Sequence, residues 1–156
     1  MSEKPEHLWF LNSLATIRVS CAQGSDGVTV MEQLLRYRDS APLHLHRNED
    51  EISYILEGQV AILQGDEVTI AGPGSYVVKP RGIFHAFWNA SDEPARMIEV
   101  IAPGGFEQYF RELAPLIPQN ATPDFGSVIA LGQRYGLEYD MQRVPELIQR
   151  YGLNMG

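Results

Sequence analysis

The sequence is short of the residue types on which several classes of protein depend. It has one cysteine, Cys21, so no disulfide can form within the chain. Lysine and arginine together number 12 against 20 aspartates and glutamates, which gives a formal net charge of −8. A nucleic-acid-binding surface needs clustered cationic side chains, so this balance argues against nucleic acid as a partner.

Long apolar runs are missing as well. No stretch approaches the roughly 20 apolar residues of a transmembrane helix, and the first residues lack the cationic and apolar regions of a secretory signal. We therefore expect no membrane partner and a location in the reducing cytoplasm. Hydrophobic residues make up 44% of the 156 residues, which is enough for a core and predicts a single domain over residues 1–156.

The first two thirds of the sequence reads as short β-type runs. Turn signals with glycine separate these runs at close intervals, as at Glu57-Gly58. The expected strands are residues 15–21, 28–37, 42–47, 52–56, 59–63, 67–70, 75–79, 85–89 and 95–101. Many short strands with no helices between them predict a sandwich or barrel, with its core at about residues 15–102.

After the expected barrel the pattern becomes helical, and residues 103–156 are expected to form a C-terminal helical extension. Phe106 and Phe110 share one helical stripe. Glu107 stands four residues before Arg111, a spacing that favours an ion pair on the helix surface. We therefore expect the extension to begin with an amphipathic helix that packs on the barrel.

The pentapeptide Gln-Arg-Tyr-Gly-Leu occurs twice in this extension, at residues 133–137 and 149–153. Each copy has a cation followed by a glycine that can take the left-handed conformation, which is typical of helix ends. We expect Asp124 to cap the helix before the first copy, and Pro145 to lie in the first turn of the helix before the second. Five residues are too few for a structural repeat unit, so the repeat is interpreted as capping chemistry.

Three of the four histidines stand at spacings that suit a metal ion. In an extended strand His44 and His46 share a face, with Cβ atoms roughly 6 to 7 Å apart. Glu51 adds a carboxylate oxygen, and His85 adds a third nitrogen if the fold brings its strand alongside. Imidazole and carboxylate together suit one divalent Fe, Ni, Mn, Co or Zn ion. The fourth histidine, His7, is expected to be a hydrogen-bonded structural residue.

Two motifs around these residues resemble those of the cupin family. Residues 44–58 look like the first cupin motif, with its fixed positions at His44, His46, Glu51 and Gly58. Residues 74–89 match the second, with Gly74, Pro80, Gly82, His85 and Asn89. The resemblance implies an all-β fold, a double-stranded β-helix or jelly-roll barrel with C-terminal helices. It also implies that the metal ligands are His44, His46, Glu51 and His85.

The other motif residues are expected to have structural roles. Gly58 stands where a tight turn needs glycine, and Asn89 is interpreted as a hydrogen-bonding residue at a strand end. Arg47, Lys79 and Arg81 flank the motifs and are expected to be solvated charges at the barrel edge. No cationic cluster is predicted, which disfavours a sugar-nucleotide epimerase because that enzyme must bind a diphosphate.

Strand alternation indicates which side chains surround the ion. It places Ser53 and Ile55 on the face of Glu51, and Phe87 on the face of His85. We therefore predict that Ser53, Ile55 and Phe87 line a substrate pocket with an aromatic wall.

The bacterial quercetin 2,3-dioxygenase-like cupins are similar to this sequence in the three-histidine, one-glutamate set and in residues 80–89 and 103–110. This resemblance implies a metal-dependent dioxygenase that uses O2 to cleave a flavonol or a related enolisable aromatic or polyketide. Glu51, able to leave the ion, is then the candidate catalytic base. Two alternatives remain open: a redox-neutral isomerase or cyclase in which the ion acts only as a Lewis acid, and a cupin that binds a small ligand.

The N-terminal run at residues 8–11 is more apolar than a free terminus needs to be. By resemblance to single-domain cupins, which commonly dimerise by strand exchange, it is expected to add a strand to a second subunit. The sequence therefore predicts a homodimer.

Overall fold

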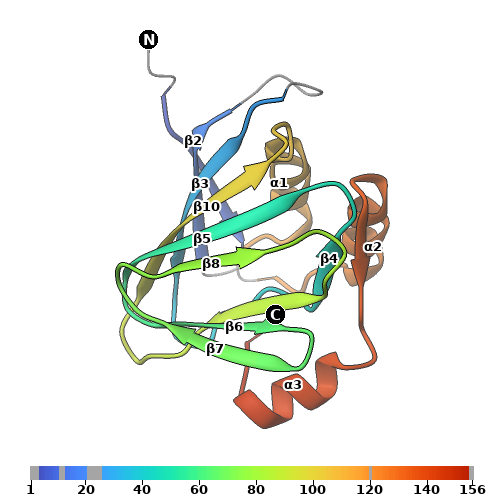
Figure 1. Ribbon diagram of the computed structural model, residues 1–156. Helices are drawn as coiled ribbons and strands as arrows, with labels where there is room; N and C mark the ends of the chain where they lie inside the picture. Colours follow the sequence, from blue (N-terminus) through green and yellow to red (C-terminus); the bar gives the residue numbers. More distant parts are fainter. Residues whose placement is uncertain (1–3, 11–12, 21–25, 120, 155–156) are drawn as a thin grey trace.

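The computed structural model describes residues 4–10, 13–20, 26–119 and 121–154, and it consists mainly of two antiparallel sheets (Figure 1). The six-stranded sheet has the order β1 (Glu6–Phe10), β2 (Ser13–Val19), β3 (Thr29–Leu35), β10 (Ala95–Ala102), β5 (Asp50–Glu57) and β8 (Tyr76–Lys79). The five-stranded sheet has the order β11 (Leu137–Tyr139), β4 (His44–His46), β9 (His85–Asn89), β6 (Val60–Gln64) and β7 (Glu67–Ala71). The predicted all-β barrel with C-terminal helices is confirmed.

Each of the nine expected strands has a counterpart in the structure. In β10 every second side chain is buried, and Met97, Glu99 and Ile101 all point to the interior. β9 is buried along its whole length, since its outer face is covered as well as its inner one. The first expected strand ends at Val19, and Cys21 lies outside the described residues.

The C-terminal part contains α1 (Glu107–Leu113), a 3-10 turn at Ala114–Leu116, α2 (Phe125–Arg134) and α3 (Val144–Tyr151). In Figure 1, α1 and α2 lie along one side of the barrel and α3 lies beneath the smaller sheet. α1 and α2 pack against Ala15, Ile17 and Met31 of the larger sheet. Leu147 of α3 packs with Trp88, which explains why β9 has no exposed face.

The predicted capping chemistry is confirmed. The side chain of Asp124 accepts a hydrogen bond from the backbone N–H of Ser127, and Pro145 lies in the first turn of α3. Gly136 and Gly152 both have positive φ angles, of 78° and 62°. The two copies of the pentapeptide therefore close two helices, as the sequence indicates.

Three features of the extension differ from the expectation. Leu137–Tyr139 is a strand, β11, which pairs with β4 in the smaller sheet. Glu107 turns into the core and accepts hydrogen bonds from Ser20 and Thr29. Arg111 instead donates to Glu6 of β1 at 2.8 Å. The two hydroxyl donors satisfy the buried carboxylate of Glu107, which must be hydrogen-bonded.

The N-terminal segment pairs with its own chain. β1 is the edge strand of the larger sheet and pairs with β2, and His7 Nδ1 lies 2.9 Å from Thr16 Oγ1, as a structural histidine would. Residues 11 and 12 lie outside the described residues. The homodimer stays a prediction. Within the part of the chain that is described, no helix has the length and apolarity needed to cross a membrane.

Candidate metal centre

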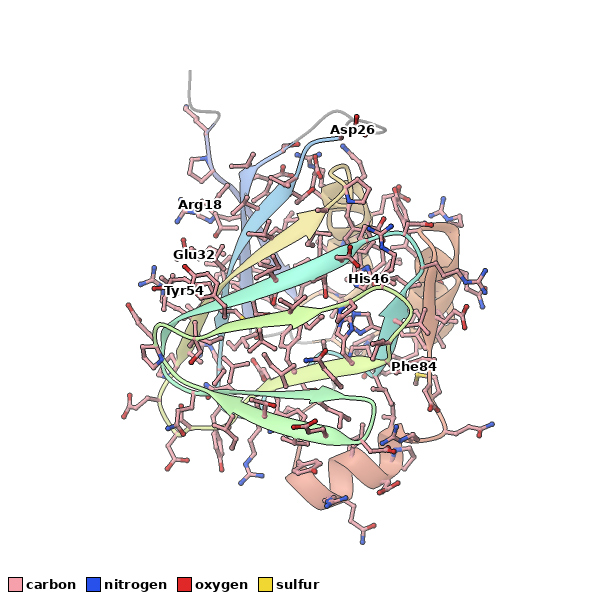
Figure 2. All side chains as sticks on the ribbon, in the orientation of Figure 1. Arg18, Asp26, Glu32, His46, Tyr54 and Phe84 are labelled. Carbon is pink, nitrogen blue, oxygen red and sulfur yellow. The ribbon has the colours of Figure 1, made fainter. Side chains whose placement is uncertain are left out.

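The four predicted ligands come from three strands in two sheets. His44 and His46 lie on β4, Glu51 on β5 and His85 on β9, and antiparallel pairing places His44 directly opposite His85. One nitrogen or oxygen atom from each residue lies within 4.8 Å of the others. In Figure 2 the His46 side chain lies on the side of the barrel that faces α2. The cluster is thus compact enough to hold one metal ion.

Each imidazole is oriented by an oxygen on its outer side. His44 Nδ1 lies 2.6 Å from the Pro42 carbonyl, His46 Nδ1 lies 3.3 Å from Glu49 Oε2 and His85 Nδ1 lies 3.3 Å from the Ile83 carbonyl. An oxygen acceptor at Nδ1 favours the tautomer with its proton there. The Nε2 atoms are then left with free lone pairs, which is how metal-binding histidines are arranged.

Several buried atoms of the cluster lack the hydrogen bonds that burial demands. His46 Nε2 and His85 Nε2 are buried without a hydrogen-bond partner among the described residues, and Glu51 Oε2 has an ion pair with Lys79 but no hydrogen bond of good geometry. His85 Nε2 lies 2.9 Å from Glu51 Oε2, and His46 Nε2 lies 3.4 Å from Glu51 Oε1. Lone pairs that face one another at these distances repel unless a cation lies between them. The donor set therefore fits a divalent transition-metal ion.

A buried lysine and a second buried glutamate lie beside Glu51. Lys79 was expected to be a solvated charge, and this is wrong, because its side chain has an exposed fraction of 0%. Its Nζ lies 3.2 Å from Glu51 Oε2, and 2.9 and 3.0 Å from the two oxygens of Glu99. Ser53 donates a 2.6 Å hydrogen bond to Glu99. The register explains the network, since Glu51 is opposite Lys79 and Ser53 is opposite Glu99.

The electrostatics keep the cluster in a metal-binding form. Burial disfavours the charge of Glu51, but Lys79 and the imidazoles outweigh burial and hold its pKa well below the ordinary value. Burial lowers the pKa of His44 far, and it also lowers the pKa of His85. Glu51 and Glu99 outweigh the burial of Lys79 and raise its pKa. An ionised carboxylate beside neutral imidazoles is the protonation state that a metal ion requires.

An apolar cavity of about 170 Å³ adjoins the cluster. Three of the candidate ligands, His44, His46 and Glu51, line it. Its aromatic lining consists of Phe10, Phe87, Phe106, Tyr109, Phe110, Phe125 and Tyr139. The Phe106 ring lies 4.8 Å from the His46 ring, between centroids. The cavity thus has aromatic side chains and three candidate metal ligands in its lining.

The three predicted pocket residues are placed differently from one another. Phe87 lines the cavity, whereas Ser53 and Ile55 are fully buried and are not among its lining residues. Ser53 faces Glu99, and Ile55 belongs to a hydrophobic cluster inside the barrel. Their contact with a substrate stays a prediction.

Tyr109 and Tyr139 were not predicted to belong to the site. Tyr139 lies on a three-residue strand that carries too little alternation to be recognised in the sequence. Asn89 does what the sequence indicates, because it donates hydrogen bonds to the carbonyls of Leu35 and Glu93 at the end of β9.

Comparisons with known proteins agree on the fold. Residues 31–101 match the family model described as Cupin domain. A comparison with curated proteins gave no match. Among solved structures, the chain is similar to TT1209 from Thermus thermophilus, with 25% identity, a TM-score of 0.51, and coverage of 64% of this chain and 84% of that one.

Two further structures share the fold. A predicted oxalate decarboxylase from Thermotoga maritima has 19% identity and a TM-score of 0.57, over 65% of this chain and 97% of that one. The nucleoside dehydratase Pac13 from Streptomyces has 16% identity and a TM-score of 0.54, over 69% of this chain and 83% of that one. Fold and site together define the class: a double-stranded β-helix, matched over residues 31–101 by the Cupin domain model, with a cluster of three histidines and one glutamate that could hold a metal ion.

Proposed function

We propose that the protein is a metal-dependent dioxygenase that cleaves a flavonol or a related enolisable aromatic or polyketide. One observation carries the proposal: three residues of the candidate metal-binding cluster line an aromatic-lined cavity. His44, His46 and Glu51 belong to both. A flat ligand in this cavity would therefore meet the metal centre while its rings contact apolar side chains.

The residues present support this chemistry in separate ways. A redox-capable ion held by the four ligands would supply Lewis acidity and a path for electrons from substrate to dioxygen. Glu51 faces the cavity as a carboxylate, so it is able to accept the proton of an enol hydroxyl. Phe87 and Phe106 line the cavity, so they would keep water away from a substrate that reacts there. The substrate supplies all the electrons, and both oxygen atoms enter the products, so no external reductant is needed.

The position of Glu51 also favours a second candidate, a redox-neutral isomerase or cyclase. Proton transfer between two carbons of an enolisable substrate needs only a Lewis acid and a carboxylate that faces the substrate. Glu51 meets that requirement without oxygen chemistry. Zinc would then support turnover as well as iron or nickel does.

Oxygen uptake separates the two candidates. Metal-free protein is reloaded separately with Fe, Ni, Mn, Co and Zn, and each form is given a panel of flavonols and other enolisable aromatics. The dioxygenase proposal expects uptake with redox-capable ions and none with zinc. Absence of uptake with every ion, despite stoichiometric loading, would contradict it, and conversion without uptake would establish the redox-neutral reaction.

A pair of variants tests the role of Glu51. Glu51→Gln is expected to abolish turnover, because an amide neither accepts the proton nor binds a metal ion as strongly. Glu57→Gln is the control, since it makes the same change at an exposed position of the same strand. Full activity of Glu51→Gln would contradict its assignment as the base.

A further inference from the structure

Two tyrosine hydroxyls meet on the cavity wall near the metal cluster. Tyr109 comes from α1 and Tyr139 from β11, and their hydroxyl oxygens are 2.8 Å apart. The pairing of β11 with β4 places Tyr139 directly opposite His44. The ring centroids of Tyr139 and His44 are 6.2 Å apart. The phenol pair is therefore a neighbour of a candidate metal ligand, and both rings line the cavity.

The pair has one more hydrogen-bond donor than it can use internally. When two hydroxyls bond to each other, only one of the two protons lies between them. In the described part of the chain, the hydroxyls of Tyr109 and Tyr139 make no other hydrogen bond to protein. Burial raises the pKa of both phenols, so both remain protonated. One proton is left without a protein acceptor, and both rings face the cavity.

The wall around this donor is apolar. Phe106, Phe110 and Leu113 line the same region of the cavity, and each lies on or next to α1. An isolated donor in an apolar wall orients a ligand by binding one of its oxygens. A purely structural hydroxyl is arranged differently in this protein, because Tyr135 donates to exposed Glu112 and does not line the cavity.

We propose that Tyr109 and Tyr139 form a hydrogen-bonding subsite for an acceptor oxygen of an aromatic ligand whose chelating oxygens face the metal cluster. The inference rests on the proposed function, because it assumes that the cavity takes an enolisable aromatic. It narrows the substrate class to polyoxygenated aromatics, which carry an oxygen besides the chelating pair. An aromatic enol without that oxygen lacks the group that the subsite recognises.

Ligand binding to zinc-loaded protein tests the subsite without turnover. The probes are quercetin, which carries hydroxyls on both outer rings, and 3-hydroxyflavone, which carries none there. Tyr109→Phe and Tyr139→Phe are each expected to weaken quercetin binding by about tenfold, the usual effect of one buried hydrogen bond, and 3-hydroxyflavone binding by less than about twofold. Tyr135→Phe is the matched control and is expected to change neither affinity.

Three results would overturn the inference. Unchanged quercetin affinity in Tyr109→Phe and Tyr139→Phe would show that the phenols make no hydrogen bond to the ligand. Equal losses of affinity for the two probes would indicate that the phenols only support the fold. Failure of zinc-loaded wild type to bind either probe would exclude the ligand class. The proposed dioxygenase fails separately, because it requires oxygen uptake with redox-capable ions, whereas probe discrimination by the tyrosines requires binding alone.

Discussion

The charge of Lys79 affects the protonation state of the two glutamates beside it, Glu51 and Glu99. Lys79 lies between the carboxylates of Glu51 and Glu99 and is fully buried. Two buried carboxylates without a cation between them would repel each other strongly. Lys79 therefore keeps Glu51 ionised and in place beside the histidines.

Replacing Lys79 by methionine is expected to destabilise the metal-free protein by about 3 to 5 kcal/mol, because it leaves uncompensated buried charge. Urea unfolding measures the change. Combining it with Glu99→Gln should recover part of the loss, since one of the two carboxylates is then neutral. Arg81→Met is the control: Arg81 also pairs with an aspartate, Asp50, but at the surface, so the expected cost is below about 1 kcal/mol. Equal losses of stability in Lys79→Met and Arg81→Met would contradict this account of Lys79.

The histidines make stability depend on pH in a defined direction. Burial lowers the pKa of His44 and His85 below their ordinary value. The unfolded chain therefore binds more protons than the folded one below about pH 6.5, and folding stability is lost as pH falls from there. Glu99, whose pKa burial raises, opposes this trend, because the folded chain keeps the proton of that carboxyl to a higher pH than the unfolded chain does.

Metal-free protein is accordingly expected to unfold at lower urea concentration at about pH 5.5 than at pH 7.5, and loaded protein should release its ion below roughly pH 6. Unfolding curves and metal retention after gel filtration measure the two effects. In His44→Asn the difference between the two pH values should shrink. His7→Asn, which alters a histidine outside the cluster, is the control. A pH-independent unfolding midpoint in wild type would contradict the assignment.

At the residue scale, the sequence predicts the ligands better than their surroundings. His44, His46 and Glu51 are close in the sequence, so strand geometry and the cupin motif suffice to find them. The network around Glu51 depends instead on register. Lys79 meets Glu99 only because β8 and β10 both pair with β5. A lysine in a short strand is ordinarily exposed, and nothing local to Lys79 indicates otherwise.

Among the elements, β11 has an effect beyond its three residues. It pairs with β4, which carries two of the candidate ligands and is itself only three residues long. Hydrogen bonds from Arg47 N to Gly136 O and from Asp140 N to Leu43 O flank the pair. Alternation along an antiparallel ladder then makes Glu138 and Leu45 the hydrogen-bonded pair between them.

Proline at position 138 removes the backbone donor of that central pair. Glu138→Pro is expected to loosen β4 and to weaken metal binding by roughly tenfold or more, as judged by competition with a chelator. Glu138→Ala is the matched control, because it removes the exposed ion pair with Arg47 but keeps the backbone N–H. Its affinity should stay within about twofold of wild type. Equal affinity in the two variants would show that β11 does not support the ligands.

The same element shows where prediction from sequence ends. Gly136 closes α2, so the sequence around it reads as a helix end and not as the approach to a strand. Pairing with β4 is a contact between segments about 90 residues apart in sequence, and no local pattern encodes it. The expected strands were found because their β-type residues and the turn signals between them are local. Tyr139 was not predicted to be a site residue for the same reason, because its place beside His44 depends on the pairing of β11 with β4.

The molecule as a whole has an edge strand that bears on its assembly. β1 ends the six-stranded sheet, and Trp9 on it is 40% exposed. An edge strand presents unpaired backbone groups, and an exposed indole adds apolar surface. Both features support the prediction of a homodimer formed through this edge.

Light scattering after gel filtration is expected to give twice the mass of one chain at micromolar concentration. Trp9→Asp should shift the protein to monomer, because it places a charge in the contact. Tyr76→Asp is the control at the opposite edge of the same sheet, where β8 lies and Tyr76 is 72% exposed. A monomeric wild type, or a dimer lost equally in both variants, would contradict assembly through β1.

The candidate metal ligands and much of the cavity wall come from different parts of the chain, and this separation affects how the substrate range of such a protein can change. All four candidate ligands lie between His44 and His85, whereas much of the cavity wall comes from residues 106–139. Substitutions in the later segment can change the shape of the cavity while the four candidate ligands stay unchanged. β11 is the exception, because a change there alters recognition and reactivity together. A designer seeking a new substrate would accordingly vary α1 and α2 and leave the backbone of β11 alone.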